Sequence, residues 1–149
     1  MRTFILLFSL LSAGCSNEIA PIQKDRSEGA AAAAEVKTKD RHWEGAFTNG
    51  MKETFISFDV SPDGKKLSNL TFKGYWRCNG KLTQDILGPE ESFQIKNGVV
   101  DGVIIDKEAY IRYELKATLN GNKAEGTFRM SITGLGCDTY VLKWTASPK

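Results

Sequence analysis

The sequence predicts a small all-β domain, an antiparallel β-barrel or β-sandwich of about eight or nine strands in a meander-like order. Three observations lead to this fold class. Apolar and polar residues alternate from about residue 43 to residue 146, turn-forming residues interrupt the alternation at short intervals, and this region lacks the helical period of about 3.6 residues. A barrel and a sandwich give the same alternation, so the pattern leaves both open.

The first half of the domain supplies the first predicted strands. WEGAFTN begins at Trp43, and the run 55–60 places Ile56, Phe58 and Val60 on one face. The residues of 61–64, Ser-Pro-Asp-Gly, are typical of a turn. In the next predicted strand, one face carries Leu70, Phe72, Gly74 and Trp76, and the opposite face carries Thr71, Lys73, Tyr75 and Arg77. Asn97-Gly98 then predicts a hairpin between ESFQIK and VVDGVIID.

The second half has the clearest alternation, in residues 110–119. One side of this predicted strand carries Ile111, Tyr113, Leu115, Ala117 and Leu119. Asn120-Gly121-Asn122 predicts a hairpin to a returning strand, KAEGTFRMSIT, in residues 123–133. After Gly134-Leu135-Gly136, the last predicted strand is TYVLKWTA, with one face formed by Tyr140, Leu142, Trp144 and Ala146.

Residues 1–14 have the organisation of a signal peptide. Arg2 is the only charge, the uncharged run FILLFSLLSA follows, and small residues come next. This run is shorter than the roughly 20 apolar residues that a membrane-spanning helix requires.

Leu11-Ser12-Ala13-Gly14-Cys15 resembles the lipobox of bacterial prolipoproteins, with Ser12 where that class prefers leucine. The resemblance implies a diacylglycerol thioether on Cys15, cleavage before it, and further acylation such as palmitate. Several acyl chains would anchor the protein firmly to a membrane. Ser16 follows the cysteine, and under the sorting rule of that class it implies the outer membrane. We therefore expect a lipid-anchored protein of the cell envelope.

The composition divides the chain into three parts. Residues 1–14 are the expected signal peptide, and residues 15–40 are an expected lipidated N-terminus and flexible, alanine-rich tether. Residues 41–149 form the expected single all-β domain.

The three cysteines divide into one lipid attachment site and one pair. With Cys15 modified as the lipobox implies, Cys78 and Cys137 remain, and in an oxidising envelope we expect a disulfide between them. A structural zinc site normally requires four ligands, and the chain has one histidine and no C-x-x-C motif.

The sequence gives no catalytic, cofactor or metal motif. We expect His42 to be solvated at the domain boundary, and Glu90 and Glu91 to be a loop pair rather than converging catalytic acids. The three aspartates Asp101, Asp106 and Asp138 lack the spacing of a calcium loop. A net charge of +2 without a basic stripe argues against nucleic acid as a partner. We expect no enzyme activity, no cofactor and no metal.

Aromatic residues are the main candidates for binding. Trp43, Trp76 and Trp144 could line a ligand cavity or fill the core. Trp43-Glu44-Gly45 resembles, over three residues, the start of lipocalin-like barrels, with the order of glycine and tryptophan reversed, and no ligand follows from it. Tyr75 and Arg77, on the opposite face from Trp76, could form a contact patch beside Cys78, Asn79 and Gly80, or simply cover a strand.

We therefore expect non-enzymatic binding at the cell envelope. A barrel with a cavity would bind a small apolar ligand, whereas a domain with a filled core would bind an envelope protein or glycan, for instance as an inhibitor of a hydrolase. A hydrolase is the third alternative, and the residues argue against it.

Overall fold

The computed structural model describes residues 39–149 and confirms the all-β prediction. This part of the chain forms a closed antiparallel barrel of six strands, with further strands paired outside the ring. It contains one 3₁₀ turn, Thr133–Leu135, and no α-helix. The barrel, rather than the sandwich, is therefore the architecture of this domain.

Ten strands make up the sheet. They are β1 (Arg41–Phe47), β2 (Phe55–Val60), β3 (Lys66–Cys78), β4 (Lys81–Leu87), β5 (Phe93–Gln94), β6 (Val99–Ile105), β7 (Arg112–Asn120), β8 (Lys123–Ile132), β9 (Cys137–Asp138) and β10 (Leu142–Pro148).

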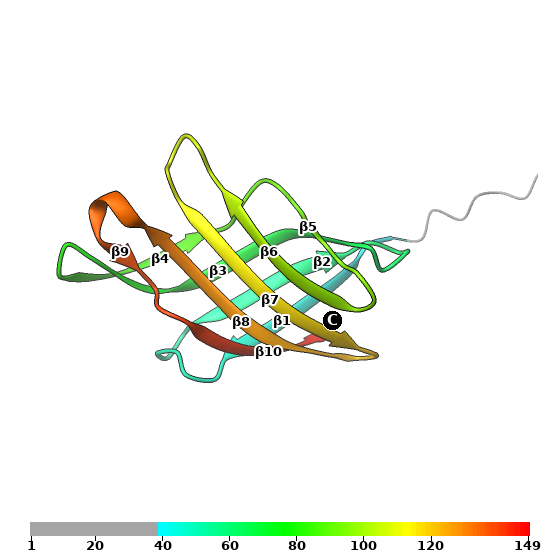
Figure 1. The fold of residues 1–149 in the computed structure, drawn as a ribbon. Helices are drawn as coiled ribbons and strands as arrows, with labels where there is room; N and C mark the ends of the chain where they lie inside the picture. The colour runs from blue at the N-terminus through cyan, green and yellow to red at the C-terminus, as the bar shows by residue number, and fades with distance from the viewer. Residues whose placement is uncertain (1–38) are drawn as a thin grey trace, which may run out of the picture. The chain divides into compact units, whose positions relative to one another are not determined.

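The ring runs β10-β1-β2-β3-β9-β8 and closes where β8 pairs with β10. Outside the ring, β7 and β6 extend the sheet from β8, while β4 and β5 pair with β3. Figure 1 shows β6, β7 and β8 crossing in front of β1, β2 and β3. The first and last strands are paired from Trp43↔Pro148 to Phe47↔Trp144, so barrel closure joins the two ends of the domain.

The turn predicted at Asn97-Gly98 is present, but the pairing predicted between its flanking strands stops at Lys96↔Val99 because β5 pairs with β3 instead. Asn97 and Gly98 have left-handed backbone conformations, with φ of 51° and 75°, as a two-residue hairpin turn of this type requires. Asn79 and Gly80 repeat the arrangement, with φ of 49° and 77°, and connect β3 to β4. Strand β4 lies outside the predicted ranges because its sequence, KLTQDIL, buries neither face and so has no alternation of apolar residues.

The interior of the barrel is filled by side chains that alternate along the strands. Phe72 stacks on Phe128, with ring centroids 5.1 Å apart, and Phe47 meets the edges of this pair. Trp144 packs edge-on against Phe58 at 5.6 Å. The residues at the centre, each almost fully buried, are Ile56, Phe58, Leu67, Phe72, Val100, Tyr113, Leu115, Phe128, Met130 and Trp144.

The last strand begins later than predicted. Strand β10 starts at Leu142, and Trp144 and Ala146 are buried as expected. Tyr140, which we expected on the same face, lies before the strand in a left-handed conformation and is 63% exposed. Its backbone conformation takes its side chain out of the alternation.

Several predictions concern residues outside the described part of the chain. The signal peptide 1–14, lipidation of Cys15, the sorting residue Ser16 and all but the end of the 15–40 tether lie there. Within residues 39–149, no helix is long and apolar enough to cross a membrane.

Candidate functional site

A disulfide fixes one end of the barrel. Cys78, at the end of β3, is bonded to Cys137, at the start of β9, which confirms the predicted pair. The two cysteines are 59 positions apart in the sequence, and Cys137 is buried. The bond therefore attaches the β8–β10 connection to the β3–β4 hairpin.

An ion pair holds the segment that follows β9. Arg129 of β8 donates from Nε to Asp138 Oδ1 at 3.1 Å and from a terminal nitrogen to Oδ2. The backbone N–H of Tyr140 also donates to Asp138 Oδ1, at 2.7 Å. Asp138 thus connects the β8 strand to the backbone of Tyr140.

Thr139 fixes the same segment from the buried side. The Met130 backbone N–H donates to the Thr139 hydroxyl, and this hydroxyl donates to the carbonyl of Tyr140, both at 2.9 Å. Tyr140 has a φ of 55°, a conformation that is unfavourable for a bulky residue and persists only where its surroundings impose it. The contacts of Asp138 and Thr139 provide that constraint.

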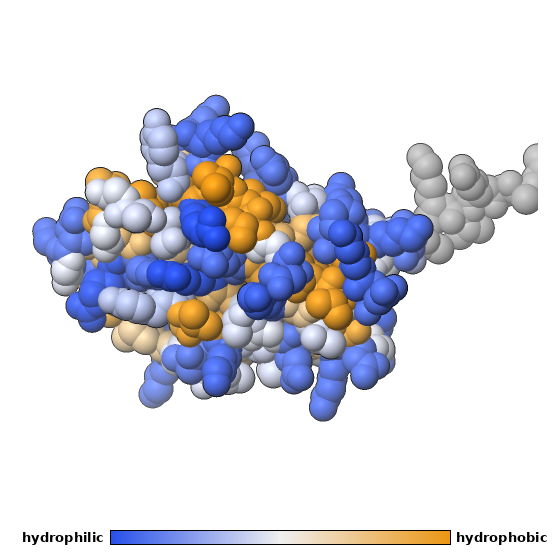
Figure 2. All heavy atoms as spheres, in the orientation of Figure 1, coloured by the Kyte–Doolittle hydropathy of each residue, from blue (hydrophilic) through white to orange (hydrophobic). Residues whose placement is uncertain are grey.

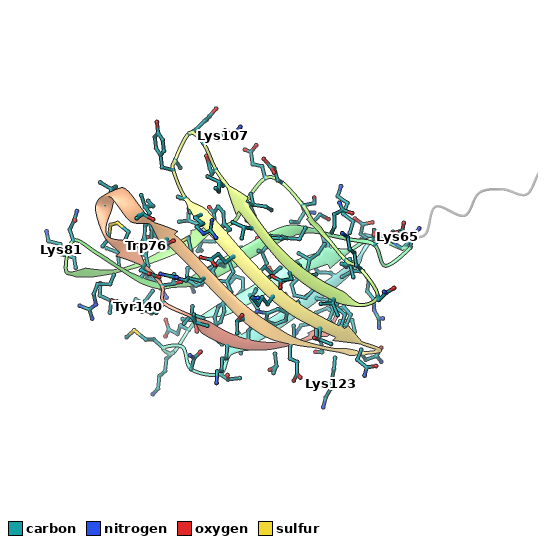
Figure 3. All side chains as sticks on the ribbon, viewed as in Figure 1. Lys65, Trp76, Lys81, Lys107, Lys123 and Tyr140 are labelled. Carbon is teal, nitrogen blue, oxygen red and sulfur yellow. A yellow bond between two sulfur atoms is a disulfide. The ribbon has the colours of Figure 1, made fainter. Side chains whose placement is uncertain are left out.

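Tyr140 stands at the rim of a cleft of about 190 Å³. Three segments line it: the β3–β4 hairpin, the loop between β1 and β2, and residues 138–142. The lining residues are Phe47, Asn49, Gly50, Met51, Thr54, Tyr75, Arg77, Leu82, Asp138, Thr139, Tyr140 and Leu142. We call this the Tyr140 cleft. Figure 3 shows Tyr140 at the same end of the barrel as Trp76 and Lys81, with Lys65 and Lys123 at the other end.

The register of the hairpin explains which of the predicted residues reach the cleft. Tyr75 pairs with Gln84 and Arg77 with Leu82, so these side chains share one face. Tyr75 and Arg77 therefore both line the cleft.

The three tryptophans lie elsewhere. Trp76 is on the opposite face of the hairpin, where its indole N–H donates to Asp85. Trp43 and Trp144 are core residues with 3% and 1% exposure. Both fill the core, and Trp43 also lines an open hollow of about 500 Å³ together with Val60 and Leu119.

The surface of the Tyr140 cleft is largely apolar and aromatic. Met51 is 53% exposed, and Leu82, Tyr140 and the adjacent Val141 are also exposed. Methionine, tyrosine and arginine are enriched in protein–protein interfaces, and Arg77 adds a positive charge to a lining that also includes the ion-paired Asp138.

Asp138 remains ionised over a wide pH range. The hydrogen bonds from Arg129 hold the pKa of the Asp138 carboxyl below its usual value, against the effect of burial, and the Tyr140 N–H adds to this. The same contact raises the pKa of Arg129. The segment is therefore held by a permanent ion pair at neutral pH.

His42 and its contacts lie apart from the Tyr140 cleft. His42 lies within β1 and contacts Asp59 at 2.7 Å, and Asn69 donates to the same carboxylate. Burial alone would raise the pKa of Asp59, but the hydrogen bonds from Asn69 and His42 outweigh it and lower the pKa. Within residues 39–149, no group of three or more His, Cys, Asp or Glu residues could hold a metal ion.

The fold and the cleft define a disulfide-stapled β-barrel with a filled core and an apolar, aromatic cleft at the stapled end. No family model, no curated protein and no solved structure matches the chain.

Residues Met51, Leu82 and Tyr140 of the cleft were not among the predicted candidates. Asn79-Gly80 is a hairpin signal that could have placed Leu82 opposite Arg77. Met51 has no comparable local signal.

Proposed function

We propose that this chain is a lipid-anchored protein of a bacterial cell envelope, and that its barrel binds a protein partner at the Tyr140 cleft without catalysing a reaction. The single observation that carries the binding proposal is Tyr140 itself. A constrained, left-handed backbone presents an exposed tyrosine beside Met51, Leu82 and Arg77. Backbone strain and exposed apolar surface both cost free energy, and both are typical of sites that a binding partner covers.

At the Tyr140 cleft, a protein partner is favoured over a small apolar ligand for two reasons. The barrel interior is occupied by buried side chains, and the cleft of about 190 Å³ is smaller than the roughly 300–1,000 Å³ of typical small-molecule sites. An inhibitor of a hydrolase is one form that a protein-binding module can take. A small-molecule carrier remains the second candidate, and native mass spectrometry of the purified chain would detect a retained ligand.

The membrane part of the proposal depends on the LSAGC sequence and on Ser16. We would express the full chain in a bacterial host with two membranes and supply radioactive palmitate. We expect label on the protein and recovery in the outer-membrane fraction. Cys15→Ser should abolish both, and label that persists in this variant would contradict lipidation at Cys15.

Site-specific photo-crosslinking tests the binding part. A photoreactive benzoylphenylalanine would replace Tyr140 or Met51 of the cleft, or Lys65 and Lys123 at the opposite end of the barrel as controls. We expect discrete protein adducts from the two cleft positions, weakened when Arg77→Ala is combined with them. Equal adducts from all four positions, or adducts insensitive to Arg77→Ala, would refute the cleft as the binding site.

A further inference from the structure

A second surface, distinct from the Tyr140 cleft, lies where β5 and β6 separate. At the Asn97-Gly98 turn the two strands are paired: Lys96 N–H donates to the Val99 carbonyl at 2.8 Å, and Val99 N–H donates to the Lys96 carbonyl at 2.9 Å. Beyond this pair β5 turns to β3, while β6 stays with β7. In the described part of the chain, β6 therefore has a partner on one edge only.

The register shows which backbone groups face this gap. The backbone N–H and C=O groups of Val99 point toward Lys96. On the opposite side, toward β7, the Gly98 carbonyl accepts from the Leu119 N–H and the Asp106 N–H donates to the Ile111 carbonyl, both at 2.8 Å. Because these directions alternate along a strand, the N–H and C=O groups of Asp101, Val103 and Ile105 face the gap. No strand of the described region pairs with them there.

The gap is a groove rather than a slit filled by side chains. One part, of about 490 Å³, lies between residues 91–96 and 99–104, and a second, of about 280 Å³, continues along 89–91 and 104–108. Glu91 and Ile104 line both parts, so the two are adjacent. We call this the β6 groove. Its floor includes buried Phe93, whose ring lies 2.9 Å from where a Cβ on Gly102 would stand.

Apart from Asp101, the outer face of β6 is apolar. Val103 is 46% and Ile105 51% exposed, and Val99 is also exposed. Figure 2 shows hydrophobic atoms at the surface where Figure 1 draws β6. Native proteins usually protect such an edge with lysine, proline or a bulge, and the sequence of β6, VVDGVII, contains neither lysine nor proline.

The charge of the groove indicates the chemistry of its occupant. Five carboxylates line it against two lysines: Glu90, Glu91, Asp101, Asp106 and Glu108 against Lys96 and Lys107. Asp101 has a salt bridge to Lys116, but the other carboxylates form no salt bridge within residues 39–149. A segment with basic side chains would complement this surface.

We propose that the β6 groove binds an extended, basic segment of a partner protein by strand addition to β6. The segment would pair with the backbone of Asp101, Val103 and Ile105 and place lysine or arginine side chains near Glu90, Glu91 and Glu108. This proposal goes beyond the function proposed for the Tyr140 cleft and uses none of its residues, so either can fail alone.

Residue-resolved amide hydrogen exchange, measured by NMR on the full chain in detergent, tests this proposal. The probe is a synthetic peptide of alternating lysine and valine as long as β6. We expect exchange to slow by about tenfold or more at Asp101, Val103 and Ile105, while Val100, Gly102 and Ile104 are protected by β7 already. A glutamate–valine peptide, and a lysine–valine peptide with every amide N-methylated, should produce no such protection.

Two variants sharpen the test. Val103→Pro removes an N–H that faces the groove without removing a bond to β7, and Glu90→Lys with Glu91→Lys reverses charge on the opposite wall. Each should weaken binding of the lysine–valine peptide by about tenfold, and Ile86→Ala on the edge strand β4 should not change it. Binding without alternate-residue protection would overturn the proposal. Protection of Asp101, Val103 and Ile105 before any peptide is added would also overturn it, by assigning the groove to a segment of this chain.

Discussion

Arg129 and Asp138 form two side-chain hydrogen bonds, and through them the β8 strand determines the backbone position of Tyr140. The half-buried Asp138 therefore holds the backbone that carries the exposed Tyr140 side chain. The Asp138 carboxylate thus stabilises residues 138–142 and, through them, the shape of the Tyr140 cleft.

Asp138→Asn should loosen the segment and weaken binding at the cleft. The amide would lose the charged bonds with Arg129, and because the pair is partly exposed we expect a free energy of unfolding lower by about 1 kcal/mol. Urea denaturation measures this loss. Crosslinking from position 140 should fall in parallel.

Asp101→Asn is the matched control. Its partner Lys116 lies 3.0 Å away, but both side chains are more than two-thirds exposed, so the loss should stay below about 0.5 kcal/mol. Equal destabilisation by the two variants would show that Asp138 has no special role.

Acid should remove the contribution of Asp138 to the free energy of unfolding. Its pKa is lowered in the folded state, so the ion pair stabilises the fold fully above the unfolded-state pKa of about 3.9 and ceases to do so as the pH falls through the lower, folded-state value. The difference in unfolding free energy between the wild type and Asp138→Asn should therefore be constant near pH 7 and shrink below about pH 4. Urea titrations at several pH values would show it. A difference that is unchanged at pH 2 to 3 would contradict the ionic origin of the effect.

The disulfide should provide a large part of the stability. It closes a span of 59 positions, and cross-links of this kind contribute about 2–4 kcal/mol. Cys78→Ala with Cys137→Ala should lose this amount in urea denaturation. Chemical reduction of the wild type should reproduce the loss, whereas it should leave the double variant unchanged. A loss under about 1 kcal/mol would mean that residual structure in the unfolded chain already holds the two cysteines close together.

The sequence predicted the parts of the fold that depend on a local residue pattern. Strands β2, β7 and β8 each bury one face, so the burial of every second residue appears directly in the sequence. The disulfide followed from the number of cysteines and the resemblance at Cys15.

No local residue pattern predicts the closure of the barrel or the Tyr140 cleft. Pairing of β1 with β10 joins segments a hundred residues apart, as at Gly45↔Ala146, and nothing local encodes it. Tyr75 and Arg77 could be recognised as one strand face, but Met51 and Tyr140 reach them only through barrel closure and the left-handed turn before β10.

Gly126 of β8 marks a position where the close approach of β7 demands a residue without a side chain. It lies beside Ala117 of β7 and pairs with Trp144 of β10. A Cβ added there would stand 1.9 Å from the Lys116 carbonyl oxygen and 2.9 Å from the Ala117 Cα. Both are backbone atoms of the neighbouring strand, so they can move only if β7 separates from β8.

Gly126→Ala should therefore destabilise the barrel by about 1–3 kcal/mol or more, as measured by urea denaturation. The near-ultraviolet circular dichroism of the tryptophans should change as well, because β10 carries Trp144 along the other edge of β8. Gly134→Ala is the matched control: an added Cβ there meets no atom within 4 Å, so its effect should stay within about 0.5 kcal/mol. If both variants unfolded at the same urea concentration, the close approach of β7 and β8 at Gly126 would not limit packing, and the β7–β8 pair would have to tolerate a wider strand spacing than the structure shows.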